Sequence, residues 1–341
     1  MQQKQSQKWF YGVDSIRFVL AFMVMLSHFD NMYADSLKHS IFLPFKFAGA
    51  FLANAFDGTS AVIAFFIISG FVIHYPSKTG INNVLQFWVR RFLRILIPLT
   101  VIIAAGAAFG HPEKTVTWSL FCELIYYALY PLLLNINLSW KTKFIIAWCV
   151  AALIIGIGSY HDVVALFKQN NNEYQGYYWQ FGNYITWLIG LPCWLLGVLI
   201  AENIDRLETT TYSKVVIYRI IVYTISCFCC LGKFHLHLSY ILTMNVFALL
   251  LYKWIQTEII YYKNSLPNFT LEKMGKFSYS LYLCHPIAFI LLKRFILFNN
   301  FTYPLFILLT ILSAYIFYWL VERPSHQIAR GINRKYFLSV K

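Results

Sequence analysis

Charged residues are scarce in this sequence. Only 12% of its 341 residues are Asp, Glu, Lys or Arg, whereas 59% are hydrophobic. This balance excludes a disordered chain and is typical of an integral membrane protein. Acidic residues are rarer than basic ones: the sequence has 14 Asp and Glu against 28 Lys and Arg. No soluble stretch is long enough to form a basic face for nucleic acid, so we attribute the excess to Lys and Arg beside membrane spans.

A disulfide framework, a cleavable signal sequence and internal repeats are also missing. All seven cysteines fall inside apolar stretches, where they behave as small hydrophobic side chains. Residues 1–12 contain no small-residue cleavage site, so the first apolar stretch is expected to stay in the protein. The inverted repeats of many transporters are not recognisable. We expect no metal site.

Long apolar segments are abundant instead. About ten of them approach the roughly 20 residues that a transmembrane helix needs. They lie at 12–33, 57–75, 92–110, 118–135, 144–161, 180–201, 215–232, 235–255, 277–298 and 303–322. Between the first two, 41–56 is shorter and broken by Pro44 and Lys46, which favours an interfacial or re-entrant segment. The predicted fold is an all-α integral membrane protein, a single transmembrane domain over 1–341 with no appended soluble domain.

The distribution of Lys and Arg predicts the orientation. With the N-terminus inside, about three quarters of these residues fall on the cytoplasmic side, as the positive-inside rule requires. Both termini are then cytoplasmic.

The first apolar segment carries polar residues that are unusual in a membrane span. Arg17 and His28 both lie in it, and a charge in a span costs about 3 kcal/mol on insertion scales. At 100° and 1.5 Å per residue, the two side chains share nearly one helix face and stand roughly 16 Å apart. One helix face is therefore predicted to present a cation at one membrane surface and an imidazole near the other.

Two further polar residues are predicted inside the membrane, and one of them, Glu123, is a candidate partner of His28. Glu123 is predicted to lie at a similar depth, and a histidine oriented by a carboxylate is the usual arrangement for a general base. The alternative for this pair is an ion pair that only joins two helices. His285, directly before Pro286, either lines a cavity or relieves the kink at the proline.

A second polar group is predicted at the inner surface. Arg91 and Arg94 share one face of a helix end, and guanidinium groups suit phosphate oxygens, although topology and anionic lipid also favour basic residues there. Glu322 closes the last span on the same side, where it either orients an arginine or forms a salt bridge. Ser69 and Gly70, within one apolar helix, are expected to serve helix packing.

Several segments in order resemble acyltransferase family 3, bacterial membrane proteins that transfer acyl groups, mostly acetyl, onto cell-surface glycans and related acceptors. The matching segments are Arg17-x10-His28, FFIISGFVI (65–73), Arg91-x-x-Arg94, Trp118-Ser119-Leu120-x-x-Glu123, the YSLYLCHP run (279–286) and Glu322-x-Pro324. The resemblance spans nearly the whole chain.

This resemblance implies a reaction and a set of site residues. The donor is a cytoplasmic acyl-CoA, most often acetyl-CoA, and the acceptor is a hydroxyl of a glycan at or toward the outer face of the bacterial inner membrane. We expect catalysis by His28, as general base or transient acyl carrier, with Glu123 as the carboxylate that orients it, and coenzyme A binding by Arg17, Arg91 and Arg94. Supporting residues are Trp118, Ser119, His285 and Glu322. The competing hypothesis is a transporter or flippase of a glycan precursor or small solute, which the missing repeats disfavour.

Overall fold

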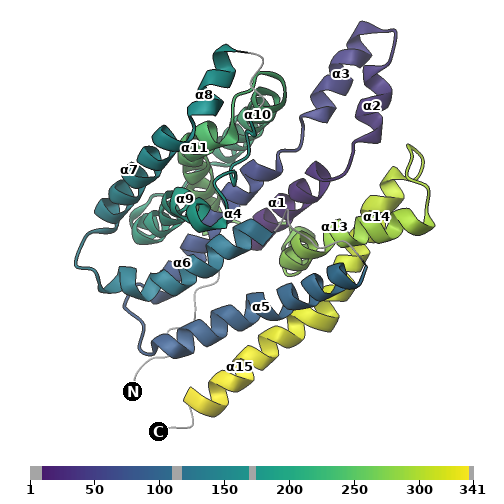
Figure 1. Cartoon of the computed structure of the whole chain (residues 1–341). Coiled ribbons are helices and arrows are strands. Elements are labelled where there is room, and N and C mark those ends of the chain that lie inside the picture. The colour runs from purple at the N-terminus through teal and green to yellow at the C-terminus, as the bar shows by residue number, and fades with distance from the viewer. Residues whose placement is uncertain (1–9, 110–116, 169–173, 338–341) are drawn as a thin grey trace.

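The computed structural model describes residues 10–109, 117–168 and 174–337, and all regular secondary structure in these ranges is helical (Figure 1). This confirms the predicted all-α class. The last residue of the predicted span 92–110 lies outside the described residues, as do four of the lysines counted for the orientation, Lys4, Lys8, Lys114 and Lys341.

Seven stretches of the described chain are long and apolar enough, by length and composition, to cross a membrane. They contain α3 (Leu43–Ala53) with α4 (Gly58–His74), α5 (Val84–Ala108), α6 (Thr117–Asn135), α7 (Trp140–Gly158), α9 (Asn183–Asn203), α10 (Tyr212–His235), and α14 (Tyr303–Phe317) with α15 (Arg323–Phe337). The other predicted spans contain α1 (Val13–Ser27), α11 (Tyr240–Tyr261) and α13 (Ser278–Phe295), which are outside this set. Ten spans and cytoplasmic termini therefore stay predictions.

The first predicted span is shorter than its apolar stretch. Helix α1 has 15 residues and ends at Ser27, with His28 as its C-cap. At 1.5 Å per residue it is about 22 Å long, less than the roughly 30 Å hydrocarbon core. The side chain of Asn31 then caps α2 (Met32–Lys38), which packs beside the separate, largely exposed helix α3 at one end of the molecule (Figure 1). His28 thus lies at the C-terminal end of a helix, whereas the predicted span 12–33 continues beyond it.

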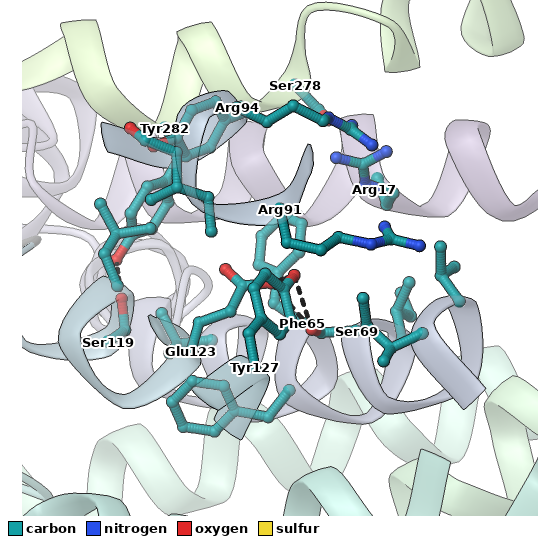
Figure 2. A pocket seen from close by; sticks show the side chains of 18 of the residues that line it. Arg17, Phe65, Ser69, Arg91, Arg94, Ser119, Glu123, Tyr127, Ser278 and Tyr282 are labelled. Carbon is teal, nitrogen blue, oxygen red and sulfur yellow. Dashed lines mark hydrogen bonds between the residues drawn. The ribbon is translucent and has the colours of Figure 1, made fainter. Parts of the chain in front are cut away.

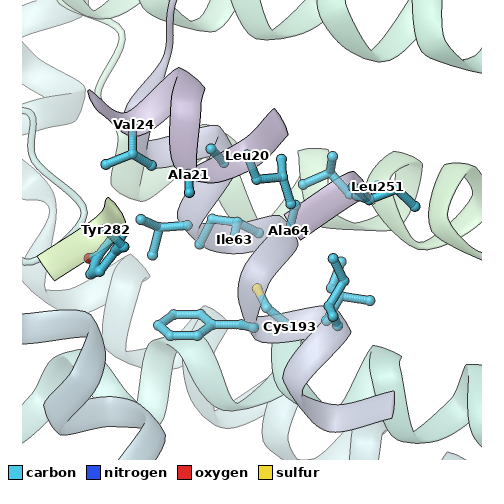
Figure 3. Close-up of a cluster of buried hydrophobic side chains, with 14 of the residues drawn as sticks. Leu20, Ala21, Val24, Ile63, Ala64, Cys193, Leu251 and Tyr282 are labelled. Atoms are coloured by element: carbon cyan, nitrogen blue, oxygen red, sulfur yellow. The ribbon is translucent and has the colours of Figure 1, made fainter. Parts of the chain in front are cut away.

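The centre of the molecule is the pair α4 and α9. Their backbones approach closely because glycines face each other: a Cβ on Gly70 would lie 2.0 Å from the carbonyl oxygen of Trp194, and a Cβ on Gly197 would lie 1.8 Å from that of Ile67. This geometry supports the packing role predicted for Gly70. Small and branched side chains of α1, α4, α9 and α11 complete the core around the pair (Figure 3).

Helix α1 connects this centre to the rest of the fold. It packs against α4 on one side and against α13 and the short α12 (Phe269–Gly275) on the other. Helices α5 and α15 run side by side (Figure 1), and α15 follows a π-helical turn, η3 (Tyr318–Glu322). A short helix, α8 (Tyr160–Phe167), follows α7. The helices α1, α4, α5, α6 and α13 and the end of η3 therefore enclose a common space.

Candidate active site

A cavity lies in this space and brings together segments that are far apart in the sequence (Figure 2). Its enclosed volume is about 140 Å³, and most of its wall is apolar. Most of the predicted site residues line it: Arg17, Arg91, Arg94, Ser119, Glu123 and Glu322. Polar side chains predicted on separate helices thus face one cavity.

Cationic side chains occupy one end of the cavity. In Figure 2 the guanidinium groups of Arg17, Arg91 and Arg94 lie on the same side. Arg91 and Arg94 point inward from one face of α5, as their spacing predicts, whereas the neighbouring Arg90 is exposed and does not line the cavity.

The charge at this end is only partly balanced by protein. Arg17 forms an ion pair with Asp14 at 3.3 Å. Among the described residues, no carboxylate lies within ion-pair distance of Arg91 or Arg94. Two partly buried guanidinium groups without a carboxylate, beside a third, give this end of the cavity an excess of positive charge and hydrogen-bond donors of the kind that suit phosphate or carboxylate oxygens.

Glu322 closes the cationic end but does not bind an arginine directly. Its carboxylate accepts hydrogen bonds from the backbone N–H of Ser280 at 3.1 Å and from the Ser280 hydroxyl at 2.5 Å. His326, one turn later, lies between the charges: its Nε2 accepts from Arg94 Nε at 3.2 Å and lies 3.8 Å from Glu322. The predicted role in orienting an arginine is therefore at most indirect. His326 was missed by the sequence argument, although its i,i+4 spacing from Glu322 was a usable signal.

Glu123 faces the middle of the cavity and has partners other than the predicted one. It accepts hydrogen bonds from Ser69 on α4, at 2.8 Å, and from Tyr127 on its own helix. No hydrogen bond joins it to His28 in the described chain. The predicted His28–Glu123 pair is therefore wrong as a direct contact. Ser69, expected only to permit packing, also accepts from Trp194 Nε1 at 3.3 Å and is part of the polar wall.

The end of the cavity away from the arginines carries hydroxyl groups. The hydroxyl groups of Ser119 and Tyr282 lie 2.6 Å apart, and Figure 2 shows both on the side opposite the guanidinium groups. Trp118, next to Ser119, is buried and does not line the cavity; its ring stacks on Trp179 and packs edge-on against Phe66. Its observed role is packing.

The two predicted histidines lie together, outside the cavity wall. His285 Nε2 is 3.2 Å from His28 Nδ1, and the ring centroids are 5.0 Å apart. The ring of Tyr282, which does line the cavity, packs edge-on against His285 at 6.3 Å between centroids. Tyr282 thus stands between the hydroxyl end of the cavity and the histidine pair.

The family to which the chain belongs follows from its sequence as a whole. The family model described as an acyltransferase domain matches residues 10–323, which include every cavity residue named above except His326. The chain is a member of this acyltransferase family. With its apolar helices, it is an integral membrane acyltransferase. No curated protein and no solved structure matches the chain.

The site of this acyltransferase can therefore be described by its polarity. A cationic end, a carboxylate in the middle and a hydroxyl end follow one another along an otherwise apolar cavity (Figure 2). Within the described residues, no group of three or more His, Cys, Asp and Glu side chains is arranged to hold a metal ion. The arrangement offers cations to an anionic group at one end and an apolar wall beyond it.

Proposed function

We propose that this protein transfers an acyl group, most often acetyl, from cytoplasmic acyl-CoA to a hydroxyl of a cell-surface or secreted glycan. The acceptor is a polysaccharide or a lipid-linked sugar, and the enzyme works in the lipid of the bacterial cytoplasmic membrane. The observation that carries the proposal is the gathering of Arg17, Arg91 and Arg94 at one end of an intramembrane cavity in a member of an acyltransferase family.

The donor fits the order of groups along the cavity. The phosphates of coenzyme A would bind the guanidinium groups, two of which lack a carboxylate partner among the described residues. The pantetheine arm would then pass Glu123, whose carboxylate can accept hydrogen bonds from its amide N–H groups. This geometry gives Glu123 a place along the donor, in place of the predicted contact with His28. The thioester would lie toward Ser119 and Tyr282.

The chemistry is assigned to His28, beyond the hydroxyl end. As general base, His28 takes the proton of the acceptor hydroxyl while the oxygen attacks the thioester carbonyl, and the proton then goes to the departing thiolate. As transient carrier, the imidazole takes the acyl group first and passes it to the acceptor. Both routes yield the same products, an ester and coenzyme A as the thiol. The helix distance of roughly 16 Å between Arg17 and His28 suits the length of the donor arm.

The proposal is tested on cells. Proton NMR of purified surface polysaccharide measures ester-linked acetate with the gene, without it, and with the gene restored. Acetate that disappears on deletion and returns on restoration is the expected result. Unchanged acetate, together with lost uptake or export of a solute, would contradict acyl transfer and favour a transporter.

A further inference from the structure

The histidine pair differs in exposure. His28 is exposed at the C-terminal end of α1, whereas His285 is fully buried in α13. The neighbouring phenylalanines Phe29 and Phe289 stack at 4.2 Å between centroids and hold the two helices in register at this point. One imidazole is therefore accessible to a substrate, and the other is placed to act only through it.

The hydrogen-bond partners fix which ring nitrogen carries hydrogen. A carbonyl oxygen can only accept, so His285 Nδ1, 3.2 Å from the carbonyl oxygen of Leu281, carries a hydrogen. In the neutral ring its Nε2 then has a lone pair. By the same argument His28 Nδ1, 2.9 Å from the carbonyl oxygen of Val24, carries a hydrogen, which it also directs to His285 Nε2 at 3.2 Å.

This arrangement determines the state of the other nitrogen of His28. With Nδ1 protonated, neutral His28 has its lone pair on Nε2. Among the residues that the structure describes, none forms a hydrogen bond with that Nε2. The exposed atom of the pair is thus the one able to accept a proton or to attack a carbonyl carbon.

We propose that His285 is a positioning residue: its Nε2 accepts from the Nδ1–H of His28, which the carbonyl oxygen of Val24 also accepts, and this second bond stabilises His28 when its Nε2 takes a proton or an acyl group in the transfer. This inference rests on the proposed function. A carboxylate usually orients a catalytic histidine. Here a neutral imidazole does so, which avoids burying a negative charge in an apolar interior.

Each proton of the reaction has a place in this scheme. His28 Nε2 takes the proton of the acceptor hydroxyl, the oxygen–carbon bond forms, the carbon–sulfur bond breaks, and the thiolate receives that proton. While His28 carries both hydrogens, its Nδ1–H still points at the lone pair of His285, which stabilises the imidazolium. His285 neither gains nor loses a proton. If His28 is acylated instead, the same Nε2 attacks the thioester, the carbon–sulfur bond breaks and coenzyme A leaves as the thiolate; the acceptor oxygen then takes the acyl group from Nε2, and its proton goes to that thiolate.

Two variants separate positioning from packing. In His285→Gln the amide oxygen can replace Nε2 as the acceptor, whereas His285→Leu keeps the volume and removes the acceptor. With purified protein, acetyl-CoA and polysaccharide from a deletion strain, thiol release should retain most of its kcat in His285→Gln. In His285→Leu it should fall about 100-fold, the scale of general-base catalysis, with KM for acetyl-CoA unchanged. In a His28→Ala background, His285→Leu should cause no further loss.

A spectroscopic measurement tests the inference separately from the proposed function. Nitrogen-15 NMR of histidine-labelled protein should show His28 as the Nδ1–H tautomer in the wild type and in both variants, because the carbonyl oxygen of Val24 remains as an acceptor. The Nδ1–H resonance of His28 should move farther from its wild-type position in His285→Leu, which removes the second acceptor, than in His285→Gln. An Nδ1–H resonance of His28 that does not move in His285→Leu, or equal kcat in the two variants of an active enzyme, would overturn the role of His285. Absence of thiol release from the wild type would instead contradict the proposed reaction, and the Nδ1–H resonance would still be measured.

Discussion

Replacing Arg91 with alanine should weaken coenzyme A binding without harming the fold. Among the described residues the Arg91 side chain forms no hydrogen bond or ion pair, and its guanidinium carbon lies 5.8 Å from the centre of the Phe87 ring. Its removal therefore leaves no buried group unpartnered. A charge-assisted hydrogen bond contributes about 1.5–3 kcal/mol. At 1.4 kcal/mol for each factor of ten, loss of one phosphate contact should raise Kd roughly 10- to 150-fold.

Arg90→Ala is the matched control. It removes the same charge from the adjacent position of α5, but its side chain is exposed and does not line the cavity. Isothermal titration of purified protein with coenzyme A should show the large effect for Arg91→Ala and little change for Arg90→Ala. Pantetheine, which has the arm without the charged head, should bind wild type and Arg91→Ala equally.

Two results would refute this reasoning. Equal loss of coenzyme A affinity in Arg90→Ala and Arg91→Ala would mean that only the general surface charge matters. Equal loss of pantetheine affinity in Arg91→Ala would mean that the arginine supports the shape of the cavity and does not bind phosphate.

Two further predictions concern stability. Glu322→Ala leaves the backbone N–H and the hydroxyl of Ser280 without their acceptor in a buried site. The free energy of unfolding should therefore fall by about 2–4 kcal/mol, whereas Glu208→Ala, at an exposed position, should change it by less than about 0.5 kcal/mol. Equal melting temperatures of the two variants would contradict the importance of these bonds. Gly197→Ala inserts a Cβ 1.8 Å from a carbonyl oxygen of α4 and should lower the free energy of unfolding by about 3 kcal/mol or more. The Cβ of Gly156→Ala meets nothing within 4 Å, so this variant should be tolerated. Thermal unfolding in detergent measures both, and a Gly197→Ala protein as stable as the wild type would disprove the close helix contact.

The cationic end of the cavity could be predicted from the sequence, because the geometry of a helix alone determines which side chains share a face. Arg91 and Arg94 are three residues apart, so they share a face wherever the helix packs. Arg17 and Glu322 are predicted at the same membrane surface as these two arginines, because all four residues lie at the ends of spans that the predicted topology puts on the inner side. The structure brings all four side chains to one cavity.

The hydroxyl and histidine end could not be predicted in the same way. Membrane depth places His28 and Glu123 at similar heights, but depth does not determine how each helix is rotated about its axis. Glu123 faces Ser69 and Tyr127, and His28 faces His285. The predicted span 12–33 also ran past the end of α1 at Ser27, although the polar residues Asp30 and Asn31 follow soon after it. Only the packing of α1 against α13 shows that the two histidines meet.

The account depends most directly on His28. The decisive measurement is ester-linked acetate on surface polysaccharide, by proton NMR, in cells that carry His28→Ala or the control His39→Ala, an exposed histidine that does not line the cavity. Protein level and coenzyme A affinity should match the wild type in both. The account predicts no acetate above the deletion strain for His28→Ala and normal acetate for His39→Ala. Wild-type acetate in His28→Ala cells would contradict it.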